Sequence, residues 1–168
     1  MRLLKALSFT TLSVLFSLIF IGGYVSATGV GLSCPDWPLC PQGFLPHEDF
    51  IIEYIHRSVA ATTGMLVIAT MAFTLKSRVA PRGMKIASII AAGAVIGQIT
   101  LGAIVIVERL HAILVTAHLG LGLVLFSMVL ITVLFAFKSD NTNKNNKTNP
   151  SALSRTSSPS NPPLRKDY

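Results

Sequence analysis

One apolar stretch of the sequence opens with a run that combines a carboxylate, an imidazole and a guanidinium, Glu53-Tyr54-Ile55-His56-Arg57. Spacings of three and four residues place Glu53, His56 and Arg57 on one face of a helix. Ionisable side chains inside a membrane are rare and costly, so each of these residues indicates a functional site.

A later apolar stretch carries His111 and His118, which a helix would place on one face, about 10 Å apart along its axis. Two imidazoles on different helices at similar depth are what a low-spin haem iron needs, with the macrocycle between the helices. His56 and His118 suit this role, but two histidines that only hydrogen-bond between helices remain an equal alternative. His111 lies beside a turn. It would gate the outer edge of a haem, shuttle a proton, or form an interfacial hydrogen bond.

The chain has two cysteines, Cys34 and Cys40, in the polar segment that precedes Glu53. If this segment faces an oxidising compartment, a disulfide is favoured. The pair would be either a structural staple over the helices or a redox-active pair that exchanges with a thiol partner. Proximity in the sequence leaves both roles open.

The elements that must position these residues follow from composition. Of 168 residues, 51% are hydrophobic and 12% are charged, about half of the roughly 25% charge of a soluble domain. This excludes a disordered chain, a small disulfide-stapled secreted domain and an ordinary soluble enzyme. Four apolar stretches are long enough to cross a bilayer and must do so as helices: 6–26, 51–75, 86–107 and 110–137.

The predicted fold class is therefore an all-α membrane protein, a four-helix transmembrane bundle over residues 1–137 with a cysteine-bearing outer loop. A tail over 138–168, rich in Asn, Ser, Lys and Pro, is expected to be disordered and to touch anionic lipid heads. The first stretch could instead be a cleaved signal peptide that ends near Val25-Ser26-Ala27.

The net charge of +7 reflects topology rather than nucleic-acid binding. Basic residues gather before the first stretch, between the second and third, and after the fourth, whereas residues 27–50 contain no Lys or Arg. This positive-inside pattern predicts a multi-pass protein of the cell (plasma) membrane with both termini cytoplasmic. Within the third stretch, Gly93 and Gly97 form a small-residue motif for close packing inside the bundle or between copies. Gln98 must face the bundle interior.

Several of these segments together resemble the haem A synthase family. They are Gly22-Gly23-Tyr24-Val25, the loop Gly31-Leu32-Ser33-Cys34-Pro35-Asp36-Trp37-Pro38-Leu39-Cys40, the Glu53–Arg57 run, Gln98-Ile99-Thr100-Leu101-Gly102 and Val115-Thr116-Ala117-His118-Leu119. The resemblance covers about residues 22–122. The loop combined with the Glu53–Arg57 run is far more specific than either histidine alone.

The resemblance implies a haem O oxidoreductase that converts the C8 methyl of haem O to the formyl of haem A by successive hydroxylation, for cytochrome oxidase assembly. By likeness, His56 and His118 would ligate the substrate iron, and Glu53 would act at the reacting methyl. Arg57 would pair with Glu53 or bind a propionate, with His111 also near the haem. Cys34 and Cys40 would form the disulfide of the family's outer loop.

One feature departs from the family: typical members have eight helices in two related halves, whereas this chain has four and resembles a half-length archaeal form. A homo-oligomer is the simpler expectation, and a second haem, haem b, is possible. Expected partners are haem O synthase, membrane lipid and an electron acceptor that the sequence does not identify, and no nucleic acid. The alternatives are a bis-His electron-transfer module, a haem carrier without catalysis and a quinone-linked thiol oxidoreductase. The last generally needs more cysteines.

Overall fold

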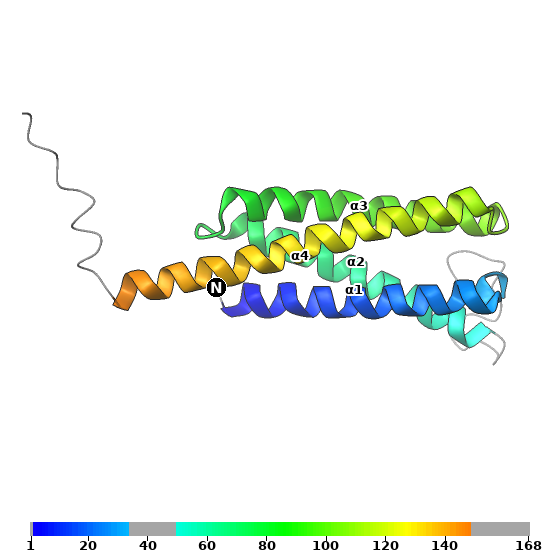
Figure 1. Cartoon of the computed structure of the whole chain (residues 1–168), viewed down its shortest axis with the longest axis horizontal. Helices are drawn as coiled ribbons and strands as arrows, with labels where there is room; N and C mark the ends of the chain where they lie inside the picture. Colours follow the sequence, from blue (N-terminus) through cyan, green and yellow to red (C-terminus); the bar gives the residue numbers. More distant parts are fainter. Residues whose placement is uncertain (1, 34–49, 149–168) are drawn as a thin grey trace, which may run out of the picture.

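The computed structural model describes residues 2–33 and 50–148, the side chains only up to residue 139. Long helices lie side by side and run alternately in opposite directions (Figure 1). They are α1 (Arg2–Thr28), α2 (Ile51–Lys76), α3 (Arg82–Val107) and α4 (Ala112–Thr148), with a short 3-10 turn, η1, at Val30–Leu32. All four α-helices are long and apolar enough to cross a membrane, which confirms the predicted all-α, four-helix membrane fold.

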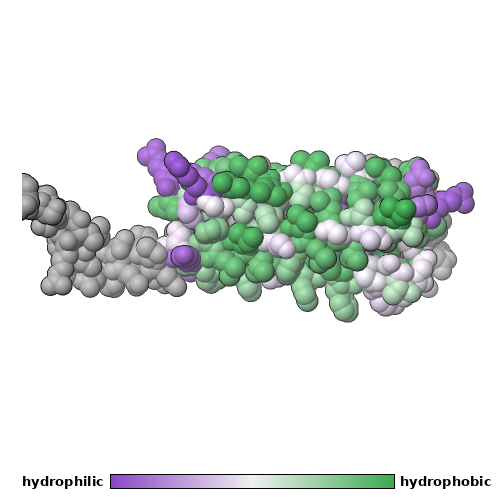
Figure 2. Space-filling model, turned by 45° about the horizontal axis from the view of Figure 1, so that its top comes forward, coloured by the Kyte–Doolittle hydropathy of each residue, from purple (hydrophilic) through white to green (hydrophobic). Residues whose placement is uncertain are grey.

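The helices form a closed ring in which each packs against two neighbours, in the order α1, α2, α3, α4 and back to α1. The shared core is built from Leu and small residues, including Leu15, Val67, Ala91, Val95 and Leu125. Large side chains such as Phe20 and Ile113 point outward instead, 74% and 72% exposed. Figure 2 shows this apolar surface as a band between hydrophilic ends. Such a band suits contact with lipid tails on all sides.

The turn between α3 and α4 differs from the prediction. Arg109 and Leu110 have positive φ angles of 49° and 61°, a left-handed conformation that no helix of L-residues continues through. The turn is closed by the Leu110 N–H, which donates to the Val105 carbonyl at 2.8 Å. The helix predicted to begin at residue 110 therefore begins at Ala112.

Helix ends also extend beyond the apolar stretches. α1 begins at Arg2 and α3 at Arg82, and α4 continues to Thr148, so residues 138–148 are helical rather than part of the predicted tail. Extending an existing helix is much easier than nucleating one, so polar residues join at the ends. At this end, the Lys5 ammonium lies 4.8 Å from the centre of the Phe137 ring and links α1 to α4.

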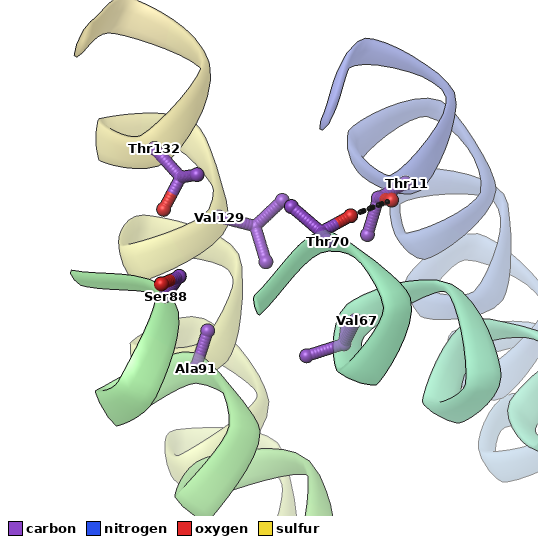
Figure 3. Close-up of a pocket in the computed structure, with 7 residues that line it drawn as sticks. All are labelled: Thr11, Val67, Thr70, Ser88, Ala91, Val129 and Thr132. Carbon is purple, nitrogen blue, oxygen red and sulfur yellow. Dashed lines mark hydrogen bonds between the residues drawn. The ribbon is translucent and has the colours of Figure 1, made fainter. Parts of the chain in front are cut away.

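A small cavity lies in the half of the bundle that contains the N-terminus. All four helices line it, through Thr11, Val67, Thr70, Ser88, Ala91, Val129 and Thr132 (Figure 3). Thr11 and Thr70 share a hydrogen bond of 2.9 Å across it. Its volume of about 10 Å³ is enough for one water molecule. A larger ligand must therefore bind elsewhere, and the opposite end of the bundle carries the residues for it.

Candidate functional site

The candidate site lies at the end of the bundle where α1 ends, α2 begins and α3 turns into α4, here called the loop end (Figure 1). Glu53, in the first turn of α2, is its most buried charged group, only 2% exposed. Its Oε1 accepts a hydrogen bond from Arg57 Nη2 at 2.5 Å, one helical turn along α2. The pair with Glu53, one of the two roles that the resemblance implies for Arg57, is therefore present.

The second oxygen of Glu53 is held by a residue from outside α2. Gly29 adopts a left-handed conformation with φ 74°, which turns the chain out of α1 and into η1. Ser33, directly after η1, then donates its hydroxyl to Glu53 Oε2 at 3.0 Å. Charge-assisted bonds of this kind offset the cost of burying a carboxylate. This role of Ser33 was not predicted from the sequence.

Each of the two predicted haem-ligating histidines is seated against a glycine of a neighbouring helix. A Cβ added to Gly22 of α1 would lie 3.1 Å from Cε1 of His56 on α2. A Cβ added to Gly102 of α3 would lie 3.3 Å from Cε1 of His118 on α4. Any side chain at either glycine would therefore press on the imidazole and force it to shift by a few tenths of an ångström. These roles of Gly22 and Gly102 were not predicted from the sequence.

The Nδ1 atoms of His56 and His118 are both buried and have no hydrogen-bond partner among the described residues. His118, Glu53 and Arg57 all lie close enough to His56 to interact with it electrostatically. The structure thus brings these four predicted residues together at one end of the bundle. Of the other predicted residues, His111 is exposed at the α3–α4 turn. Cys34 and Cys40 lie outside the described residues.

This donor set fits a haem better than a bare metal ion. Within residues 2–33 and 50–148, no group of three or more His, Cys, Asp or Glu side chains could hold an ion alone. Two imidazoles on facing helices are sufficient for a haem iron, because the porphyrin supplies the remaining ligands. The imidazoles of His56 on α2 and His118 on α4 therefore suit a porphyrin between these two helices.

A family model described as cytochrome oxidase assembly protein matches residues 5–50 and 45–158. The chain belongs to this family.

Among its relatives are proteins named heme A synthase. The one from Bacillus licheniformis is 36% identical over 138 residues, which cover 80% of this chain and 45% of the relative. The one from an Exiguobacterium species is 37% identical over 147 residues, 79% of this chain and 45% of the relative. The one from Bacillus pumilus is 32% identical over 141 residues, which cover 81% of this chain and 46% of the relative. This chain thus spans less than half the length of these relatives.

Proposed function

We propose that this chain oxidises the C8 methyl of haem O to the formyl group of haem A, with His56 and His118 as the axial ligands of the substrate iron. The observation that carries the proposal is a pair of half-buried imidazoles, with buried Nδ1 atoms that have no partner among the described residues, beside a buried carboxylate one helical turn from one of them. The relatives named heme A synthase support the same reaction.

Glu53 is the proposed catalytic residue. Oxidation of a methyl group conjugated to a porphyrin removes electrons from it and develops positive charge at that carbon. A fixed carboxylate in a water-poor site stabilises this charge. The same carboxylate can accept a proton from the water that supplies the oxygen atom. Ser33 and Arg57 hold its two oxygens in place, and the guanidinium of Arg57 also suits a haem propionate.

Assembly of several copies is part of this proposal. Gly93 on α3 and Gly120 on α4 are exposed, and a Cβ added to either would meet no atom within 4 Å. Such positions allow helices of a second copy to approach closely. In the assembly we place the loop end at the outer membrane face, with Cys34 and Cys40 as a disulfide. Electrons leave to an external acceptor, and haem O synthase supplies the substrate.

The proposal is tested by co-expressing the full chain with a source of haem O and extracting the haem that copurifies with it. Mass analysis should find haem A or its hydroxymethyl precursor. Unchanged haem O would contradict catalysis and favour a haem carrier, and haem b alone would favour an electron-transfer module. Protein that retains no haem would exclude the histidine site itself.

Replacing Ser33 with Ala is expected to lower the rate of formyl formation about 10-fold, because a hydrogen bond to a charged group contributes about 1.5–3 kcal/mol. The amount of haem O bound should not change, since Ser33 contacts Glu53 and neither histidine. Rates and haem content would be measured on the same preparations. Ser33→Thr keeps the hydroxyl and should restore most of the rate. Equal rates in Ser33→Ala and wild type would show that this bond does not position Glu53.

Replacing Gly22 with Ala is expected to weaken haem O binding several-fold, because the new methyl group would press on the His56 ring at 3.1 Å. Gly23→Ala is a matched control. It has the same gain in helix propensity, but its Cβ meets nothing within 4 Å. Optical titration of both variants with haem O measures the difference. Identical affinities would show that the Gly22–His56 contact does not shape the site.

A further inference from the structure

The turn between α3 and α4 contains a leucine whose backbone conformation costs free energy. Leu110 has a φ of 61° and follows Arg109, which has a φ of 49°. Residues with a Cβ are crowded in this left-handed region, whereas glycine enters it freely. A glycine at position 110 would therefore form the same turn at a lower cost. Strained residues persist where surrounding contacts hold them in place, and the Leu110 side chain makes such contacts.

The side chain of Leu110 packs against η1 at the loop end. A Cβ added to Gly31, the middle residue of η1, would lie 3.4 Å from both Cδ1 and Cδ2 of Leu110. It would also lie 3.4 Å from Cγ1 of Val25 on α1. Gly31 is buried, and Val25 is only 9% exposed. Leu110 therefore completes a small apolar contact between α1, η1 and the α3–α4 turn, which lie at the same end of the bundle (Figure 1).

The element that Leu110 covers also positions Ser33. η1 is a single 3-10 turn, Val30–Leu32, and the Ser33 N–H closes it by donating to the Val30 carbonyl at 3.1 Å. The hydrogen bonds of such turns have poor geometry, so a single turn depends on its surroundings. Ser33 then donates its hydroxyl to Glu53 Oε2 at 3.0 Å. A shift of η1 would therefore move this donor away from the carboxylate.

We propose, resting on the function proposed above, that Leu110 is a positioning residue for the oxidation. Its two methyl groups hold η1 against Val25, so that the Ser33 hydroxyl stays bonded to Glu53. The contacts of Leu110 with Gly31 and of Ser33 with Glu53 thus link the α3–α4 turn to the proposed catalytic carboxylate. Leu110 acts through Ser33 and contributes no group to the chemistry.

The first test needs no haem. Hydrogen–deuterium exchange of the purified full chain, measured by mass spectrometry, should show faster exchange of the η1 amides in Leu110→Ala than in wild type. Ile113→Ala is the matched control, because Ile113 lies in the first turn of α4 and is 72% exposed. Its exchange at η1 should equal that of wild type. Equal exchange in Leu110→Ala and wild type would overturn the inference independently of any catalysis.

The second test measures formyl formation and haem O affinity on the same variants. Leu110→Ala should lower the rate towards the roughly 10-fold loss expected of Ser33→Ala and leave the affinity for haem O at the wild-type level. Leu110→Met, whose flexible side chain can still reach Gly31, should restore most of the rate. Leu110→Gly removes the backbone strain together with the side chain. It should be as slow as Leu110→Ala although it unfolds at no lower temperature.

A wild-type rate in Leu110→Gly would show that only the backbone of the turn matters, and would overturn the inference. Combining substitutions then shows whether Leu110 acts through Ser33. Leu110→Ala should slow the Ser33→Ala protein no further, because the bond that Leu110 supports is already absent. Losses that multiply would give Leu110 a separate role and contradict the inference, while haem A production by wild type would stand. A wild type that binds haem O but forms no haem A would instead refute the proposed function, and with it the role of Leu110, even if exchange at η1 had changed.

Discussion

Replacing Glu53 with Gln is expected to lower the rate of haem A formation by about 100-fold or more, the range lost with a key electrostatic or general-base group. The amide keeps the size of the carboxylate, and its oxygen can still accept from Arg57 while its NH2 donates to the Ser33 hydroxyl oxygen. It cannot balance developing positive charge or take a proton from water. Haem O content should therefore stay at the wild-type level. Timed extraction of haem from loaded protein measures both quantities.

Ser58→Ala is a suitable control for this experiment because it lies on the same helix. Its hydroxyl is exposed and bonds only to the carbonyl of Tyr54, so both rate and haem content should match wild type. If Glu53→Gln lost its haem in proportion to its activity, Glu53 would be a structural residue. A rate within a few-fold of wild type would exclude it from the chemistry.

Replacing His118 with Ala is expected to have the second-largest effect, a loss of haem O affinity of about 100-fold or more. Removing a group that merely supports a metal ligand already costs about 10–100-fold, and loss of the ligand itself should cost at least as much. The substitution also leaves a space beside Gly102, so the loss does not come from overpacking. Equilibrium titration with haem O in detergent micelles gives the affinity.

Thr116→Ala is the control on α4, since its exposed hydroxyl bonds only to the carbonyl of Ala112 one turn earlier. Its affinity for haem O should equal that of wild type. A His118→Ala protein that binds haem O as tightly as Thr116→Ala would show that His118 is not a ligand. His118 would then serve only to pack α4 against α3.

The features that depend on residues close in sequence were predictable. The length of the apolar stretches predicted the four helices. The four-residue spacing predicted that Glu53 and Arg57 share one helix face, where they form an ion pair. The left-handed Arg109 and Leu110 were not predicted, because neither residue type favours that conformation and only the closure of the turn requires it. The extension of α4 to Thr148 was missed for a similar reason, since a polar segment gives no apolar signal for a helix.

The contacts between helices could not be predicted from the sequence. His56 and His118 were predicted as functional residues from their side-chain chemistry. Their contacts with Gly22 and Gly102 depend instead on how neighbouring helices align along their axes. That alignment is set by packing of whole helix surfaces rather than by spacing within one helix. The same is true of the contact between Gln98 and Gly122. Ser33 reaches Glu53 only because η1 folds back over the start of α2.

The central claim is that one haem O is held between α2 and α4 by His56 and His118. Electron paramagnetic resonance of the ferric, haem O-loaded full chain tests this most directly, because two axial imidazoles give a low-spin iron. Wild type should give a low-spin signal, and both His56→Ala and His118→Ala should give a high-spin signal. A high-spin signal in wild type, or a low-spin signal that survives either substitution, would contradict this claim.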